Sequence, residues 1–411
     1  MDISSILSFR NIFRPAYRHQ YLRILALVSV VRGFVIISVV LFLPGILLTT
    51  LQKFGCDQPT AMLIIGGLYA LLALLHMAVT IPCSWIVTKV GVKGAFLVST
   101  LLLILFILLV FGATTLEELV IGFVIWGISA GIWWYTYHTF FLEVGDKDKV
   151  GRETSIFMLL QIGVSLIVPL VIGALLSTFN GLMIGYFLIV VSCIALVLTL
   201  FIRDFERLPV AKVKEVVSDI RHHPRRMCSY VAMGGDSALA SFVWPLFLAM
   251  VLQNPLSLGI FAGMVTVVTA IATIWSGKLT DKMQKTKLEH LGGTIIAVSW
   301  MIRALFGTTP VLFVADIIYR IFHSFFVIPM DAYTYELGMQ SNKARVVAMR
   351  EIGVMFGYLV TVILFMIIVM VRLPIQFVFL FGTVLGMSTW LLKSPNRMAD
   401  DPRLKISHIH R

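Results

Sequence analysis

The sequence predicts an all-α membrane protein made of two related six-helix bundles, with both termini in the cytoplasm. Three observations carry this prediction: apolar residues make up 59% of the 411 positions, twelve apolar segments follow one another, and two short stretches recur at one fixed spacing. A soluble domain carries about 25% charged residues, whereas this chain carries 13%. The chain is therefore expected to fold in lipid and not in water.

The apolar segments have lengths close to the ~20 residues that a helix needs to cross a bilayer. The first six are expected at residues 22–48, 60–82, 94–111, 119–141, 154–176 and 181–202. The second six are expected at 227–252, 256–275, 291–306, 311–329, 346–371 and 375–392, of which the ninth is short and the tenth is interrupted by charge. The predicted parts are an N-terminal segment (1–21), a first half (22–202), a linker (203–226), a second half (227–392) and a tail (393–411).

Two loops repeat with a common offset. Lys89 stands 193 positions before Lys282, and Ser84 stands 193 positions before Gly277. The same offset relates Glu143, Gly145 and Arg152 to Glu336, Gly338 and Arg345. Because two separate loops share one register, the two halves are related by an internal repeat, which is typical of transporters.

Basic residues follow the positive-inside rule. If both termini are cytoplasmic, 28 of the 33 Lys and Arg residues fall in the inner loops and tails, and only Lys53 and Arg372 lie outside. The net charge of +12 is then orientation charge, so no nucleic-acid partner is expected. The predicted location is the plasma (inner) membrane, as a multi-pass protein.

The linker, the cysteines and the motif search indicate no catalytic or metal-binding chemistry. The polar stretch 203–226 repeats Val210, Val213, Val217 and Ile220 at helical spacing, which predicts a linker with an interfacial helix. The four cysteines are scattered, so neither a disulfide framework nor a metal site is indicated. No nucleotide-binding loop is present in the sequence, and no cofactor is expected.

The stretch 277–282, GKLTDK, resembles the G-x-L-x-D-[RK] loop signature of the major facilitator superfamily. In the first half Lys89 fits this signature, but Ser84 replaces its glycine and Thr88 replaces its acid. The resemblance implies major facilitator architecture: a secondary transporter in which the first, fourth, seventh and tenth helices line a central cavity.

A second resemblance is partial. Pro169 and Gly173 match the antiporter motif that this superfamily carries in its fifth helix, but valine and isoleucine replace three of the motif's glycines. The match favours antiport only weakly.

The loop signature is expected to form a cytoplasmic gate, because a carboxylate in a tight turn can accept N–H groups at a neighbouring helix end and pair with arginine. Asp281 is expected near Glu143 and Arg152, with Glu336 and Arg345 in the symmetry-related place. In the alternative interpretation these charges are solvated and only orient the protein. The gate set is Lys89, Glu143, Arg152, Gly277, Asp281, Lys282, Glu336 and Arg345.

Ionisable residues inside a membrane are costly, so each is a functional candidate. Arg32 and Asp236 lie at matching depths, about 14 Å from the inner surface at 1.5 Å per residue. They are expected to face each other across the seam between the halves, either as substrate and coupling groups or as a structural ion pair. Trp244, just before Pro245, belongs to the same candidate site.

The tenth segment carries Asp316, Arg320 and His323 on one helical face. Arg303 stands at a similar depth across the preceding turn, so a structural Arg303–Asp316 pair is expected. That pair would leave Arg320 and His323 without an obvious acid, which makes them candidates for binding substrate or carrying a coupling proton.

Aromatic residues of the fourth segment are candidates for stacking on a flat or cationic substrate. Trp126 and Trp133 share one stripe of this helix. His138 is expected to be an interfacial anchor, and His76 in the second segment a packing residue. Arg350 and Glu351 in the eleventh segment are expected to belong with the gate.

The function that these features predict is secondary active transport of a small organic solute by alternating access, with proton-coupled export favoured. The expected partners are a small-molecule substrate, a coupling proton and the lipid bilayer, and the expected oligomeric state is a monomer. Uptake and flipping of an anionic lipid headgroup are alternatives. A membrane enzyme is disfavoured because hydrolase motifs are missing from the sequence, and a transporter-like scaffold remains a further alternative.

Overall fold

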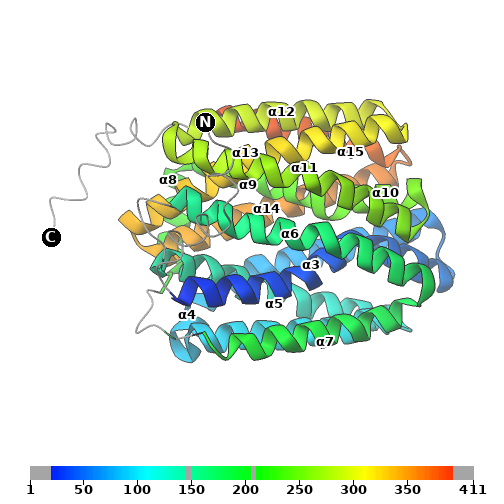
Figure 1. Ribbon diagram of the computed structural model, residues 1–411, viewed down its shortest axis with the longest axis horizontal. Helices are drawn as coiled ribbons and strands as arrows, with labels where there is room; N and C mark the ends of the chain where they lie inside the picture. Colours follow the sequence, from blue (N-terminus) through cyan, green and yellow to red (C-terminus); the bar gives the residue numbers. More distant parts are fainter. Residues whose placement is uncertain (1–19, 145–149, 203, 205–209, 392–411) are drawn as a thin grey trace, which may run out of the picture.

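The computed structural model describes residues 20–144, 150–202, 204 and 210–391, and for some residues within helices only the backbone. The described chain is a bundle of helices that run side by side, with the first half below the second in Figure 1. The helices of the first half are α3 (Gln20–Lys53), α4 (Gln58–Phe111), α5 (Leu116–Val144), α6 (Val150–Thr178) and α7 (Gly181–Thr199). The second half contains α9 (Pro224–Ala238), η1 (Leu239–Val243), α10 (Trp244–Leu252), α11 (Pro255–Lys282), α12 (Lys285–Leu305), α13 (Thr309–Gln340), α14 (Lys343–Met370), η2 (Ile375–Phe377), α15 (Val378–Ser388) and η3 (Thr389–Leu391).

These elements make twelve membrane helices. Seven helices in the described ranges are long and apolar enough to cross a membrane by length and composition. One of them, α4, holds the second and third helices and changes direction at Gly91, whose φ is 75°. Another membrane helix, the seventh, is assembled from α9, η1 and α10. The predicted all-α fold of two six-helix halves is confirmed.

Three helices are longer or more regular than the sequence predicts: the second, expected to end at residue 82, the ninth, expected to be short, and the tenth, expected to be interrupted by charge. The second membrane helix continues past Pro82 to the turn at Gly91. The ninth, α12, has 21 residues, and the tenth, α13, is one helix of 32 residues. Charge does not interrupt α13 because Asp316 pairs with Arg303 and Arg320, so no charged group forces the helix apart.

The seventh membrane helix contains a π-helical turn at η1. Pro245 has no backbone N–H, so the helix cannot make the usual bond to the carbonyl four residues earlier, at Ser241. A local widening of the ladder is one way in which a helix absorbs such a break. The Ser241 hydroxyl bonds back to the Ser237 carbonyl at 2.6 Å.

The bundle has two distinguishable ends. The linker end is where α5 ends at Val144, α13 ends at Gln340 and α8 (Val213–His222) lies, on the left of Figure 1. The opposite end is where α3 ends at Lys53 and α10 ends at Leu252. Residues 1–19 of the predicted N-terminal segment and the predicted tail, 393–411, lie outside the described residues.

The halves meet along two helix pairs, α6 with α11 and α4 with α14. The first pair depends on small residues. A Cβ added to Gly259 would lie 2.2 Å from the Pro169 carbonyl oxygen, and one added to Gly173 would lie 2.7 Å from the Pro255 carbonyl oxygen. Small residues allow this close approach of backbones, which is a general way of packing helices in membranes.

The halves also touch at both ends of the seam. At the opposite end Gln58 Nε2 of α4 donates to Met250 Sδ of α10 at 3.2 Å, and deeper in the seam Tyr69 of α4 stacks on Phe242 of η1, with ring centroids 4.3 Å apart. At the linker end Lys343 Nζ lies 2.6 Å from Glu143 Oε2. Contacts at both ends leave space for a cavity between them, at mid-depth.

The α6–α11 contact yields a first prediction. Gly259→Ala places a methyl group against backbone that cannot move independently, so we expect a destabilisation of about 1–3 kcal/mol, measured as a lower midpoint of thermal unfolding in detergent. Gly163→Ala on α6 is the matched control, because a Cβ there meets nothing within 4 Å. Equal loss of stability in the two variants would contradict the proposed close packing.

Candidate functional site

A cavity of about 330 Å³ lies between the two halves at mid-depth. Its walls come from α3, α4 and α5 of the first half and from α9, η1 and α14 of the second. Polar side chains lie toward its linker side, and aromatic side chains form much of the remainder. The polar lining residues include Arg32, His76, Arg350 and Glu351, and the aromatic ones are Tyr69, Trp126, Trp133, Trp134 and Tyr358.

Arg32 is a buried cation on the wall of this cavity. Its residue is 3% exposed, and its guanidinium lies 4.0 Å from the centroid of the Trp133 ring. Its polar contacts are long, at 3.5 Å to both Thr100 Oγ1 and Ser129 Oγ. Its Nε has no hydrogen-bond partner, and no carboxylate pairs with it among the side chains that the structure describes.

A cluster centred on Glu351 joins the two halves beside Arg32. His76 Nε2 of α4 lies 3.1 Å from Glu351 Oε2, and His138 Nε2 of α5 lies 3.5 Å from Glu351 Oε1. Arg350 bonds to the same carboxylate and to Asp331 of α13, its NH2 lying 2.7 Å from Asp331 Oδ1. We call Asp331, Arg350, Glu351, His76 and His138 the seam cluster.

The seam cluster is fully buried, and it ties α4 and α5 of one half to α13 and α14 of the other. His138 also contacts Tyr335 of α13, with 2.7 Å between Nδ1 and the phenol oxygen. His76 and His138 are each 1% exposed. His138 is therefore not an interfacial anchor, and His76 is more than a packing residue.

A second cluster lies wholly within the second half, and we call it the second-half cluster. Its members are Asp236, Trp244, Trp300, Arg303, Asp316, Tyr319, Arg320 and His323. The Asp236 carboxylate accepts hydrogen bonds from Trp300 Nε1 at 2.7 Å and from the Tyr319 hydroxyl at 2.8 Å, and His323 Nε2 lies 3.4 Å away. The expectation that Asp236 faces Arg32 is therefore wrong. Met233 and Ser237 of the same helix face the cavity, so Asp236 is turned toward α12 and α13.

The expected Arg303–Asp316 pair forms the centre of this second cluster. Arg303 NH2 lies 2.6 Å from Asp316 Oδ1, and both residues are almost fully buried. The guanidinium sits 4.2 Å from the Trp244 ring centroid and 4.3 Å from that of Trp300, which places Trp244 around Arg303 and not in the cavity.

Arg320 and His323 also have acidic neighbours, contrary to the expectation from sequence. Arg320 Nε lies 3.4 Å from Asp316 Oδ2, and His323 approaches Asp236. Of the candidate substrate and coupling residues, Arg32, Trp126 and Trp133 line the cavity, whereas Asp236, Trp244, Arg320 and His323 gather in the second-half cluster.

The gate residues have mixed outcomes. Glu143 pairs with Lys343 across the halves, and Arg345 Nε lies 2.6 Å from Asp219 Oδ2 of the linker helix α8. The Lys89 ammonium lies 4.9 Å from the centroid of the Trp85 ring. Glu336, near the linker end of α13, also has an interaction partner. The side chains of Arg152, Gly277, Asp281 and Lys282 lie outside the described residues, so their part in the gate stays a prediction.

The first-half loop obtains its acid from elsewhere in the chain. Thr88 donates to the Ser84 carbonyl and does not replace the missing carboxylate. Instead Asp204, which follows α7, accepts the Lys93 backbone N–H at 2.8 Å at the start of the third membrane helix. The contact requires glycine at position 91, because a Cβ there would lie 2.4 Å from the carboxylate.

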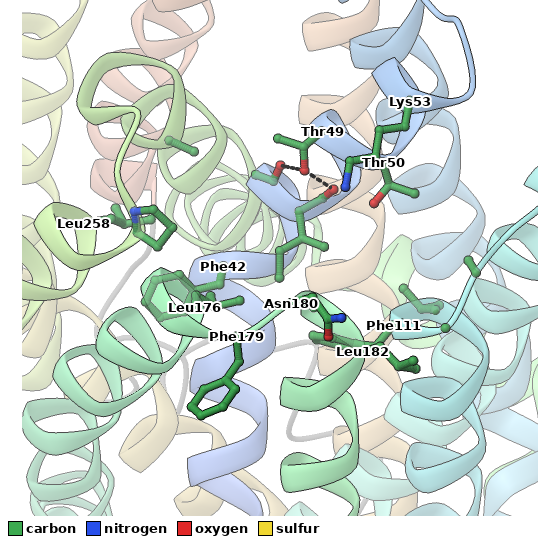
Figure 2. A pocket seen from close by; sticks show the side chains of 18 of the residues that line it. Phe42, Thr49, Thr50, Lys53, Phe111, Leu176, Phe179, Asn180, Leu182 and Leu258 are labelled. Atoms are coloured by element: carbon green, nitrogen blue, oxygen red, sulfur yellow. Dashed lines mark hydrogen bonds between the residues drawn. The ribbon is translucent and has the colours of Figure 1, made fainter.

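A larger pocket of about 530 Å³ opens at the opposite end and is shown in Figure 2. Phe42, Phe111 and Leu176 contribute apolar walls, and Lys53 lies at its edge. The Thr49 hydroxyl in this pocket donates to the backbone carbonyls of its own helix, at 2.8 Å and 3.3 Å. Its charged lining residue is exposed, so the smaller central cavity, which holds a buried cation, is the better candidate site.

Comparison with known proteins settles the family. The sequence model of the Major Facilitator Superfamily matches residues 24–302. The chain belongs to this superfamily. It is therefore a multi-pass membrane protein with the architecture of a secondary transporter.

Two solved structures share the fold of this superfamily member. The human organic anion transporter MFSD10 (TETRAN) aligns with a TM-score of 0.68 at 12% identity, covering 91% of this chain and 100% of that one. A D-xylose–proton symporter aligns with a TM-score of 0.70 at 12% identity, covering 90% and 98%. The uncharacterized protein YqgE of Bacillus subtilis (strain 168) is 21% identical over 271 residues, a match that spans 63% of each chain.

Sequence reasoning about this major facilitator protein missed the seam cluster. The signal was present, because His76, Asp331 and the Arg350–Glu351 pair are ionisable residues within apolar segments, each a candidate under the same rule that selected Arg32. The spacing of residues along one chain could not show that α4, α5, α13 and α14 bring them together. The contact is long-range, with 275 positions between His76 and Glu351.

The second-half cluster yields a prediction about stability. Arg303→Met leaves the buried Asp316 carboxylate without its closest partner, and we expect a loss of about 3–5 kcal/mol. The double variant Arg303→Met with Asp316→Asn should recover most of that loss in thermal unfolding.

Arg320→Met is the matched control. Its side chain is 34% exposed and its contact with Asp316 is longer, so we expect a loss below about 1 kcal/mol. If the double variant is as unstable as Arg303→Met alone, the ion pair is not what stabilises this cluster.

Proposed function

We propose that this major facilitator protein transports small organic anions with a flat apolar body, by alternating access and with coupling to protons. The single observation that carries the proposal is Arg32. A buried charge without a partner is strongly unfavourable, and Arg32 lines a cavity with long polar contacts and an unbonded Nε. An anion that enters the cavity would supply the missing partner.

The aromatic lining supports an apolar body on that anion. Trp126 and Trp133 offer ring faces, and Tyr69 and Tyr358 add partly apolar walls. Ligand sites of this kind combine a mostly apolar lining with a few placed polar groups that fix orientation. A cavity of about 330 Å³ is in the size range of such sites. The same fold occurs in an organic anion transporter and in a D-xylose–proton symporter, so the proposed substrate class rests on Arg32 and the cavity lining.

Alternating access requires each end of the seam to open in turn. At the linker end the opening must break the Lys343–Glu143 contact and the seam cluster. From the opposite end it must separate Gln58 from Met250 and, deeper in the seam, Tyr69 from Phe242. The ion pairs on the linker side and the stacked aromatic rings on the other side of the cavity make the two openings chemically different.

The proposal also covers the direction of anion transport and the form of its coupling to protons. The sequence favours export, and uptake is the alternative. The residues behind the antiport interpretation, Pro169 and Gly173, are both used in packing α6 against α11, so they give antiport little support. An imposed pH gradient across proteoliposomes distinguishes export by antiport from cotransport. Antiport moves the anion against the proton flow, and cotransport moves it with the proton flow.

We also propose a monomer in the plasma (inner) membrane, with the linker end in the cytoplasm. The basic residues of the linker and of the loops at that end support this orientation, since only Lys53 and Arg372 lie at the opposite end. Labelling of single cysteines placed at the two ends, in intact cells, tests the orientation.

Arg32 provides the decisive test. We expect Arg32→Gln to reduce binding and transport of aromatic carboxylates and sulfonates by at least tenfold, corresponding to about 1.4 kcal/mol or more. Arg32→Lys should retain part of the activity, because it keeps the charge but loses the planar group over Trp133. Quenching of tryptophan fluorescence reports binding, and flux into proteoliposomes reports transport.

Arg320→Gln is the matched control, since it removes an arginine from the second-half cluster and should bind anions as the wild type does. Binding of neutral or cationic compounds in preference to anions would refute the substrate class. Binding of anionic lysolipids but of none of the soluble aromatic anions would favour the lipid-headgroup alternative.

A further inference from the structure

The seam cluster and Arg32 together carry no net charge in the formal states of their groups. Arg32 and Arg350 contribute two positive charges, and Asp331 and Glu351 contribute two negative charges, while His76 and His138 are neutral unless protonated. A monoanion that binds beside Arg32 would leave the buried assembly with one negative charge. Net charge in a low-dielectric interior is unfavourable.

We infer that binding of the organic anion takes up one proton, which the seam cluster holds between His138 and Glu351. The inference rests on the proposed anion transport and names the coupling site of that function. The proton restores the neutrality that the anion removes. Anion and proton would then occupy the protein together and cross in the same direction, so the inference selects cotransport over the antiport that the sequence favours.

The geometry around His138 identifies the receiving atom. Its Nδ1 lies 2.7 Å from the Tyr335 hydroxyl oxygen, and its Nε2 is buried, lies 3.5 Å from Glu351 Oε1 and has no hydrogen bond. The Tyr335 hydroxyl donates to Nδ1 or accepts from it, depending on the tautomer of the imidazole. In the tautomer whose N–H is on Nδ1 and is donated to the Tyr335 oxygen, the Nε2 lone pair faces the Glu351 carboxylate and can receive a proton. A hydronium ion or a protonated buffer molecule would give its proton to Nε2, and the resulting imidazolium would donate from Nε2 to the carboxylate. The donor's O–H or N–H bond breaks, the Nε2–H bond forms, and the deprotonated donor stays in the solvent.

Other groups lie close enough to affect the proton affinity of His138, but they already have hydrogen-bond partners. His76 Nε2 is within hydrogen-bond distance of the other carboxylate oxygen, and Arg350 is shared between two acids. The titratable and charged groups that belong to the seam cluster, interact with it or share the cavity wall with it are Arg32 of α3, His76 and Cys83 of α4, His138 of α5, Tyr230 of α9, Asp331 and Tyr335 of α13, and Arg350, Glu351 and Tyr358 of α14.

A bound metal ion is a poorer explanation of the two histidines. Within the described chain, no group of three or more His, Cys, Asp or Glu side chains is arranged to hold a metal ion. Arg350 also lies directly on the Glu351 carboxylate, where it would repel a cation.

The test uses naphthalene-2-sulfonate, which stays ionised throughout the range in which histidine titrates, so any proton taken up belongs to the protein. Calorimetric titrations of the purified full chain, in buffers of different ionisation enthalpy, count the protons. We expect about one proton per bound anion, and an affinity that falls by up to about tenfold per pH unit as the pH rises through the titration. Binding without proton uptake overturns the inference with the wild type alone.

Variants then locate the proton. Glu351→Gln removes one negative charge from the assembly of Arg32 and the seam cluster. A bound monoanion then restores neutrality by itself, so it should bind without proton uptake and with an affinity independent of pH. His138→Gln should also lose the uptake. Asp236→Asn is the matched control: it neutralises an equally buried, hydrogen-bonded carboxylate of the second-half cluster and should keep about one proton per anion.

Each failure has a separate signature. Uptake that persists in Glu351→Gln and disappears in Asp236→Asn would assign the proton to the second-half cluster and overturn the inference. If neither naphthalene-2-sulfonate nor naphthalene-2-carboxylate binds the wild type, the proposed anion transport fails, and this inference fails with it. If the anion binds and no proton is taken up, only the inference fails.

Discussion

The cost of placing charge inside a membrane constrains the interior of this protein. Charged side chains within membrane helices are tolerated when they pair with one another or face a polar cavity. The described interior follows this rule in two clusters: one lies within the second half around Arg303 and Asp316, and the other crosses the seam around Glu351. Arg32 departs from this rule, since it is buried beside the seam cluster with no carboxylate of its own among the described side chains.

The two clusters have different consequences because they connect different bodies. The Arg303–Asp316 cluster joins α12 and α13 within one half, so it can persist while the halves move relative to each other. The seam cluster joins α4 and α5 to α13 and α14, so any movement that separates the halves at that level must break it. Changes in protonation or ligand occupancy at the seam therefore bias the arrangement of the whole molecule.

The fold was largely predictable because its determinants are local or periodic. Segment length and apolar composition located the membrane helices, and the repeat divided the chain into two halves. The site was less predictable, because it depends on which face each helix turns toward the seam. Asp236 and Ser237 are neighbours in sequence, yet Ser237 lines the cavity and Asp236 bonds to Trp300 and Tyr319. A shift of one position along a helix is enough to turn a side chain from the cavity toward the interior of its own half.

The π turn at η1 divides the seventh membrane helix into two parts with separate attachments. Asp236, before the turn, is anchored to α12 and α13, whereas Phe242, within it, packs on Tyr69 of the other half. A widened turn followed by Pro245 lacks part of the regular hydrogen-bond ladder, so bending there gives up fewer bonds than bending elsewhere in the helix. The helix can thus bend at η1. Phe242, on the turn itself, can then move away from Tyr69 while Asp236 stays bonded to α12 and α13.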